Sequence, residues 1–237
     1  GEYIVRGKGI NIFRDILLGL YNPGIYHDPM PYANIPRMDR EKFYKDTFEF
    51  SDKTKRYALS KIKSVLTALG CSYSCTYCYV SSLIDNLKEA YNDVDVRPPS
   101  IIQDRLLETV VQEGEEILAL DSIYGTKTTA VFDQADISLN NMLWWKQLKE
   151  LWGDRVGIPF YIQARPAMLA GTKGKQRIKL ISDKGLVAGI SMAIESGNPK
   201  IRKLLLDRHE SNETILDAIK NVKEGNIPLR TQSIIGL

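Results

Sequence analysis

Beyond about residue 60, two patterns of apolar positions alternate along the chain. One is a short, continuous apolar run, which is typical of a buried strand. In the other, between these runs, apolar residues recur every three or four positions, which is typical of amphipathic helices. Strands that alternate with helices at intervals of about 30 residues pair in parallel, so the pattern predicts an α/β fold with a parallel sheet. The predicted strands are the short apolar runs at residues 64–69, 129–132, 160–163, 187–194 and 229–235.

Two of the predicted helices carry capping signals. Ser100 is expected to cap a helix while Gln103 bonds back to it, and Ser211 is expected to cap a helix that stops at Gly225. A third helix is expected over 140–152. Five strands suit an open or partial barrel. Because a further crossover helix and strand would follow the fifth strand, we expect the barrel to be incomplete at the C-terminal end of this chain.

The first 58 residues are organised differently. Residues 1–20 are expected to be the end of an upstream domain, with a short strand at Tyr3 to Val5 and an amphipathic helix after it. Residues 21–58 contain several prolines among polar and aromatic residues, which is typical of a linker. The core domain is therefore expected over residues 59–237.

Composition sets limits on the kind of protein. The chain has 237 residues, of which 43% are hydrophobic and 26% charged, a balance typical of soluble globular proteins. No segment approaches the roughly 18 to 20 apolar residues of a membrane span, and the N-terminus lacks a signal-peptide pattern. The net charge is only +3, and the basic residues are scattered among acidic ones, so nucleic acid is not an expected partner. We expect a cytoplasmic protein.

The three cysteines, Cys71, Cys75 and Cys78, lie within eight residues of one another. An odd and clustered set cannot form a disulfide framework, so it indicates metal or redox chemistry. Four-iron clusters normally take four cysteine ligands, and three would leave one iron open, as in a catalytic metal centre. Two alternatives stay open: a zinc site completed by His27 or His209, and three inert thiols.

Polar side chains follow several of the predicted strands. Because active sites of parallel sheets lie at the carboxyl ends of the strands, these side chains are candidates for a site next to the cysteines. The alternatives are local: an acid after the second strand also stabilises the next helix N-terminus, and Arg165 also pairs with an acidic neighbour. The candidates are Asp133, Gln134 and Asp136 after the second strand, Gln163 and Arg165 after the third, and Glu195 and Ser196 after the fourth.

The segment from Cys71 to Cys78, with the sequence CSYSCTYC, resembles the CxxxCxxC signature of the radical S-adenosylmethionine (radical SAM) superfamily, including the aromatic residue before the third cysteine. The resemblance implies a partial (β/α)6 TIM-like barrel and a [4Fe–4S] cluster whose open iron is chelated by S-adenosylmethionine. Reductive cleavage would give methionine and a 5′-deoxyadenosyl radical that abstracts hydrogen from a small-molecule or peptide substrate. It also implies an electron donor of the flavodoxin or ferredoxin type.

The resemblance also implies which other residues contact the cofactor. Tyr77 would hold the adenine, and Arg208 would contact the cofactor carboxylate. Residues 132–136 take the place of the second-strand motif that contacts the methionine amino group, although they depart from its Gly-Gly-Glu form. Residues 193–197, Ala-Ile-Glu-Ser-Gly, resemble the fourth-strand motif, and Ser233 to Gly236 resemble the fifth-strand motif near the adenine.

The start of the chain has a second resemblance. Residues 3–9, followed by an amphipathic helix, resemble the last strand and helix of a cobalamin-binding domain, although Lys8 and Ile10 replace the usual acidic residues. This implies cobalamin as a further cofactor and a cobalamin-dependent methyltransferase or cyclase. The alternatives are a radical SAM enzyme without cobalamin, of the methylthiotransferase-like or RNA-modifying kind, and a non-catalytic zinc-binding module.

Overall fold

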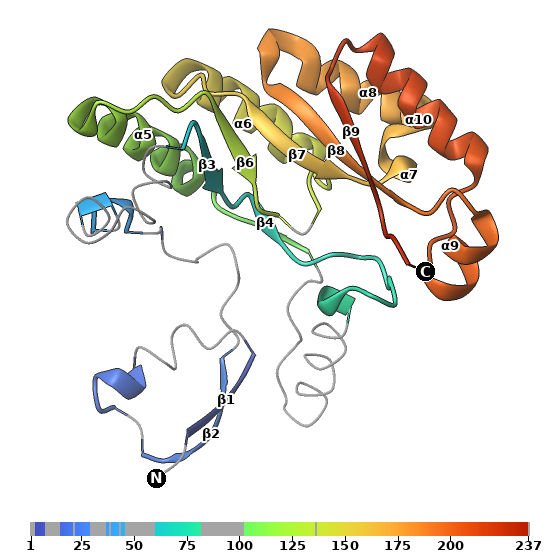
Figure 1. The fold of residues 1–237 in the computed structure, drawn as a ribbon. Helices are drawn as coiled ribbons and strands as arrows, with labels where there is room; N and C mark the ends of the chain where they lie inside the picture. Colours follow the sequence, from blue (N-terminus) through green and yellow to red (C-terminus); the bar gives the residue numbers. More distant parts are fainter. Residues whose placement is uncertain are drawn as a thin grey trace.

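A sheet of five parallel strands, in the order β3-β6-β7-β8-β9, forms the centre of the molecule in the computed structural model (Figure 1). The α/β fold with a parallel sheet is therefore confirmed, and it corresponds to part of a TIM-like barrel. The strands are β3 (Ile62–Val65), β6 (Ala130–Asp133), β7 (Phe160–Ala164), β8 (Val187–Glu195) and β9 (Leu229–Ser233). The structure describes residues 3–7, 15–20, 22–28, 37, 39–42, 44–45, 60–81, 102–135 and 137–236.

The main helices lie together on one face of this sheet (Figure 1). Each strand pairs with the strand that follows it in this order, so the chain moves in one direction across the sheet. Right-handed crossovers in a constant direction place the helices that cover the sheet on the same face. The helices are α5 (Leu107–Tyr124), α6 (Met142–Arg155), α7 (Pro166–Leu169), α8 (Gly171–Ser182), α9 (Pro199–Leu205) and α10 (Asn212–Glu224), with the short η2 (Asp183–Gly185). Among them, α9 lies beyond the carboxyl ends of the strands (Figure 1).

The side chains of β7 alternate between the two faces of the sheet. Phe160 and Ile162 are fully buried against the helices, whereas Tyr161 and Gln163 point to the opposite face. The ring of Phe160 lies 4.6 Å from that of Trp152 and 5.7 Å from that of Trp145, both on α6. These aromatic contacts fix α6 on the sheet. We call the helix-covered side the outer face and the side bearing Tyr161 the inner face.

Two predicted elements differ from the structure, and tertiary pairing explains both. The helix expected from Ser100 begins at Leu107 instead, because Gln103 and Asp104 form β5 (Gln103–Asp104), antiparallel to β4 (Ala68–Leu69). Ser100 itself lies outside the described residues. The strand predicted over 64–69 is divided into β3 and β4, since Thr67 between them binds the carboxylate of Asp133.

The helix predicted from Ser211 to Gly225 is confirmed, but Gly225 ends it for a different physical reason than expected. The hydroxyl of Ser211 accepts a hydrogen bond from the Thr214 amide at 3.2 Å. Gly225 ends α10 with φ at −77°, so it does not supply a left-handed turn. A Cβ at this position would lie 2.2 Å from Cγ2 of Ile178, so a glycine is needed because α8 packs closely here.

The described residues before residue 60 include two strands. The strand expected at the start is present as β1 (Tyr3–Gly7), and it pairs in parallel with β2 (Gly24–Asp28), inside the range predicted as linker. Further along, Arg40 is buried and pairs with Glu113 of α5 at 3.4 Å, so residues 39–42 are anchored to the core. No helix among the described residues is long and apolar enough to cross a membrane.

Candidate active site

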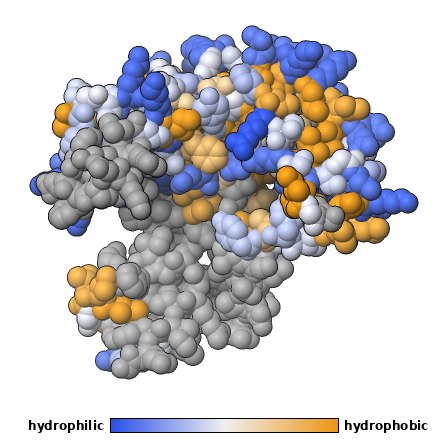
Figure 2. Space-filling view, viewed as in Figure 1, coloured by the Kyte–Doolittle hydropathy of each residue, from blue (hydrophilic) through white to orange (hydrophobic). Residues whose placement is uncertain are grey.

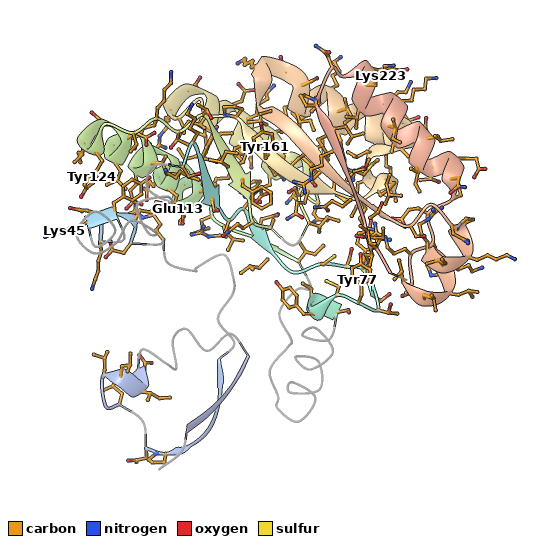
Figure 3. The ribbon with its side chains drawn as sticks, in the orientation of Figure 1. Lys45, Tyr77, Glu113, Tyr124, Tyr161 and Lys223 are labelled. Atoms are coloured by element: carbon orange, nitrogen blue, oxygen red, sulfur yellow. The ribbon has the colours of Figure 1, made fainter. Side chains whose placement is uncertain are left out.

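The cysteine loop follows β4 and runs along the carboxyl edge of the sheet. All three cysteines, which are in the free form, face one cavity of about 170 Å³. Residues from the ends of β7, β8 and β9 complete its wall, and Tyr77, labelled in Figure 3, belongs to the same lining. The lining residues are Cys71, Tyr73, Cys75, Tyr77, Cys78, Ile137, Gln163, Ala164, Arg165, Ser191, Ala193, Glu195, Arg208 and Gln232.

Hydrogen bonds hold this loop against the segment that follows α9. The hydroxyl of Ser74 donates to Asp207, and that of Thr76 donates to the carbonyl of Leu205. Within the loop, the Ser81 hydroxyl donates to the carbonyls of Cys75 and Cys78, at 3.0 and 2.8 Å. These bonds fix the backbone on both sides of the cysteines, so the thiols are presented from a braced loop.

Arg165 connects the third strand to the cysteines. One of its N–H groups donates to Sγ of Cys75 at 3.4 Å, and two others bind the carboxylate of Glu210 at 2.7 and 2.8 Å. The guanidinium also lies 3.8 Å from the ring centroid of Tyr73. Burial raises the pKa of Glu210, but the Arg165 hydrogen bonds and charge outweigh it and hold that pKa below its usual range. Both charges are therefore retained beside the thiol.

A second polar group joins Tyr77, Glu195 and Arg208 across the cavity. The Tyr77 hydroxyl donates to Oε1 of Glu195 at 2.8 Å and accepts from Arg208 at 3.0 Å. Burial, followed by the hydrogen bond to Glu195, raises the pKa of Tyr77 well above its usual range, so the phenol stays neutral. Glu195 has φ at 66°, in the left-handed region that disfavours residues with a side chain, which is common at functional sites.

Asp133, a predicted cofactor contact, lies away from this cavity. Its side chain is 0% exposed and accepts hydrogen bonds from the Thr67 amide and hydroxyl, the Ala135 amide and the Ser138 hydroxyl. Burial raises the pKa of Asp133, while these donors act in the opposite direction. In this arrangement the carboxylate joins the end of β6 to the β3–β4 connection. It has no exposed surface for a cofactor.

The remaining predicted residues divide into two groups. Tyr77, Gln163, Arg165, Glu195 and Arg208 meet at the cavity with the three cysteines. The structure does not bring two others there: Gln134 is exposed, and the Ser196 hydroxyl accepts from the Asn198 amide at 3.2 Å. Asp136 lies outside the described residues.

Sequence reasoning missed three residues of the site. Tyr73 lies inside the cysteine motif and covers Arg165, and Glu210 pairs with that arginine. Gln232 points into the cavity from β9. Strand alternation could have identified Gln232, because it occupies the same face as Arg230. Glu210 had no local signal, since its partner is 45 positions away.

The donor set fits a four-iron cluster better than a single ion. No three His, Cys, Asp or Glu side chains in the described ranges are grouped closely enough to share one metal ion. A [4Fe–4S] cluster takes one thiolate per iron, so its ligands surround the cluster without converging on one atom. Three thiols facing one cavity from a single loop meet that requirement.

Residues 65–237 match the Radical SAM superfamily, and the chain therefore belongs to this superfamily. Membership implies a [4Fe–4S] cluster and S-adenosylmethionine, as the cysteine motif predicted. No curated protein sequence matches the chain.

Solved structures with a similar arrangement include methylornithine synthase, with 12% identity and a TM-score of 0.49 over 84% of this chain and 52% of that one. Another is a mutant of spore photoproduct lyase, with 12% identity and a TM-score of 0.45 over 97% of this chain and 66% of that one. The chain thus spans about half the length of the former.

Proposed function

We propose that this chain binds a [4Fe–4S] cluster through Cys71, Cys75 and Cys78 and cleaves S-adenosylmethionine reductively. The observation that supports this most directly is the shared cavity, in which the three thiols face charged and polar groups from three neighbouring strands. When bound, the cluster and S-adenosylmethionine would supply an electron and a 5′-deoxyadenosyl radical for hydrogen abstraction. An electron donor of the flavodoxin or ferredoxin type is expected as partner, and the cytoplasm as location.

The residues of the cavity have distinct proposed roles. Arg208 is suited to a cofactor carboxylate, because its Nε is buried without a hydrogen-bond partner among the described residues. Glu195 and Tyr77 would accept and donate hydrogen bonds to the ribose and adenine end. Gln163 would contact the methionine end. Asp133 would act indirectly, by fixing the end of β6 beside the cysteine loop.

Arg165 would act on the cluster itself. Its N–H group already lies 3.4 Å from Sγ of Cys75, and a thiolate bound to iron still accepts such a hydrogen bond. Hydrogen bonds and positive charge near cluster sulfurs favour the reduced state. The pairing with Glu210 keeps the guanidinium in this orientation, so Glu210 would be a positioning residue.

Methyl transfer or cyclisation that depends on cobalamin is the finer proposal. It rests on the resemblance of residues 3–9 to the end of a cobalamin-binding domain. The strand β1 described at Tyr3–Gly7 agrees with a strand at this place. Lys8 and Ile10, where the motif departs from its usual acidic form, lie outside the described residues. Spectroscopic titration with hydroxocobalamin would test this part separately.

Metal analysis after anaerobic reconstitution tests the central proposal. We expect about four irons and four sulfides per chain, together with 5′-deoxyadenosine when dithionite and S-adenosylmethionine are added. Replacing Cys71, Cys75 or Cys78 with alanine should abolish both. Ser72→Ala, an exposed change in the same loop, is the matched control and should leave both intact.

Two results would refute the cluster assignment. One is a single equivalent of zinc without iron, which would support the non-catalytic zinc module instead. The other is undiminished 5′-deoxyadenosine from any of the three cysteine variants.

A further inference from the structure

A second cavity, of about 470 Å³, lies on the inner face beside the cysteine cavity. Ser191 and Gln232 line both, so a molecule in one cavity borders the other. In Figure 3 the labelled Tyr161 lies on this face, and Figure 2 shows polar and apolar side chains next to each other over the sheet. The lining residues are Ile62, Phe132, Tyr161, Ile162, Gly189, Ile190, Ser191, Pro228, Leu229, Arg230 and Gln232.

The strand register arranges this lining in two rows. Phe132 pairs with Tyr161, and Tyr161 pairs with Gly189, so the first row places two aromatic rings, on β6 and β7, next to a glycine on β8. A Cβ at Gly189 would lie 2.7 Å from the Tyr161 ring, so the glycine leaves room for that ring to lie against β8. The rings of Phe132 and Tyr161 therefore form the aromatic floor of this cavity.

The second row is polar and lies nearer the cysteines. Gln163 pairs with Ser191, and Ser191 pairs with Arg230, so an amide, a hydroxyl and a guanidinium stand side by side on β7, β8 and β9. Of these three, Gln163 lines the cysteine cavity, Arg230 lines the second cavity, and Ser191 lines both. The polar row thus separates the aromatic floor from the radical-generating site.

Two groups of the polar row have no protein partner among the described residues. The Ser191 hydroxyl is buried without a hydrogen bond, which is costly unless another molecule supplies one. The side chain of Arg230 makes neither a hydrogen bond nor an ion pair with any described residue. Arg165 and Arg208, in the neighbouring cavity, are by contrast engaged by carboxylates and a carbonyl.

We propose that this second cavity binds the substrate, and that the substrate has a flat aromatic body and an anionic group, either a carboxylate or a phosphate. The body would lie on Phe132 and Tyr161, and the anion would bind Arg230, with Ser191 as a further donor. Guanidinium groups recognise carboxylates and phosphates through two parallel hydrogen bonds, and the cavity is of the size that encloses small ligands. Its role as a substrate site rests on the proposed function, whereas its ability to bind such a ligand does not.

Calorimetric titration of the 237-residue chain with small probes tests this, both with and without the reconstituted cluster. The probes are phenylacetate, phenyl phosphate and the neutral 2-phenylethanol. We expect saturable binding of at least one anion and at least tenfold weaker binding of the alcohol. The tighter of the two anions identifies the anionic group as carboxylate or phosphate.

Variants connect the binding to the named residues. Arg230→Gln should weaken anion binding at least tenfold, while Arg230→Lys should retain part of it, because the positive charge remains. Lys223→Gln removes one positive charge from α10, where Lys223 lies in Figure 3, and should leave anion binding unchanged. Arg230 is exposed, so its variants should fold, and circular dichroism checks this.

Equal affinity of Arg230→Gln and the unaltered chain for the anion would overturn the proposal. So would equal affinity for the alcohol and the anion, or no saturable binding of either anion. The two proposals fail separately. Anion binding without cluster assembly counts against the proposed function alone, and cluster assembly without anion binding counts against this inference alone.

Discussion

The two faces of the five-stranded sheet differ in what their side chains bind. On the outer face, Phe160, Ile162 and Met192 are fully buried among helices. On the inner face, Tyr161, Ser191 and Arg230 line a cavity, and the two polar groups among them lack protein partners in the described part of the chain. Neighbouring residues of one strand therefore serve different purposes: the outer positions hold the fold together, and the inner positions are available to ligands.

This difference means that effects on stability and on function should separate by face. Large apolar side chains in a packed interior are costly to remove, because their contacts and volume cannot be replaced. A side chain that borders a cavity has fewer contacts to lose. Substitutions at adjacent positions of the same strand can test the separation directly.

The largest expected effect is at Phe160. Phe160→Ala should lower the free energy of unfolding by about 3–5 kcal/mol, since it opens a cavity between α6 and the sheet. Tyr161→Ala, its neighbour on the inner face, should cost only about 1 kcal/mol, because that ring is partly exposed already. Urea unfolding of the cluster-free chain, followed by circular dichroism, measures both. Similar losses for the two variants would contradict the distinction between faces.

An intermediate effect is expected at Glu210, which pairs with Arg165 beside the cysteine cavity. Glu210→Gln should destabilise the fold by about 3 kcal/mol, because it leaves the buried Arg165 charge without its counter-ion. The folded pKa of Glu210 is lowered, so the ionised carboxylate contributes stability above its unfolded pKa of about 4.3, and this is lost as pH falls through the folded pKa. Unfolding at a series of pH values should therefore show the difference between Glu210→Gln and the unaltered chain shrinking at acidic pH. A difference that stays constant with pH would exclude this coupling.

The smallest effect is expected at Ser191. Ser191→Ala should leave the free energy of unfolding unchanged or raise it by up to about 1 kcal/mol, since the buried hydroxyl has no hydrogen bond to lose and alanine does not carry the cost of burying it. Ser138→Ala is the matched comparison: its hydroxyl donates to the buried Asp133 at 2.7 Å, so its removal should cost about 1–3 kcal/mol. Thermal unfolding of the two variants side by side distinguishes them. A marked loss of stability in Ser191→Ala would mean that the inner-face hydroxyl serves the fold.

Strand positions were predictable because a buried parallel strand needs an apolar run, which is a local property. The five predicted runs all overlap strands of the sheet. Local signals failed where a distant partner intervened. The pairing of Gln103–Asp104 with Ala68–Leu69 displaced the start of α5 to Leu107, although Ser100 and Gln103 carry a capping pattern.

The site was predictable to a similar extent. The spacing of Cys71, Cys75 and Cys78 identified the superfamily, since the motif is carried by eight consecutive residues. Of the polar residues at strand ends, Arg165 and Glu195 line the cysteine cavity. Asp133 is instead buried and accepts hydrogen bonds from Thr67 and Ser138. Position at a strand end did not distinguish these outcomes.

The sequence by itself therefore determined the cysteine motif, the α/β class and the order of strands and helices, because each is recorded in short stretches of chain. Only the tertiary structure decided which charged groups pair with each other and which face a cavity. Arg165 meets Glu210 across 45 positions, while Arg230, on β9, meets no described partner. Such pairings depend on the register and on the side of the sheet to which each residue points, and both are set when the strands and helices pack together.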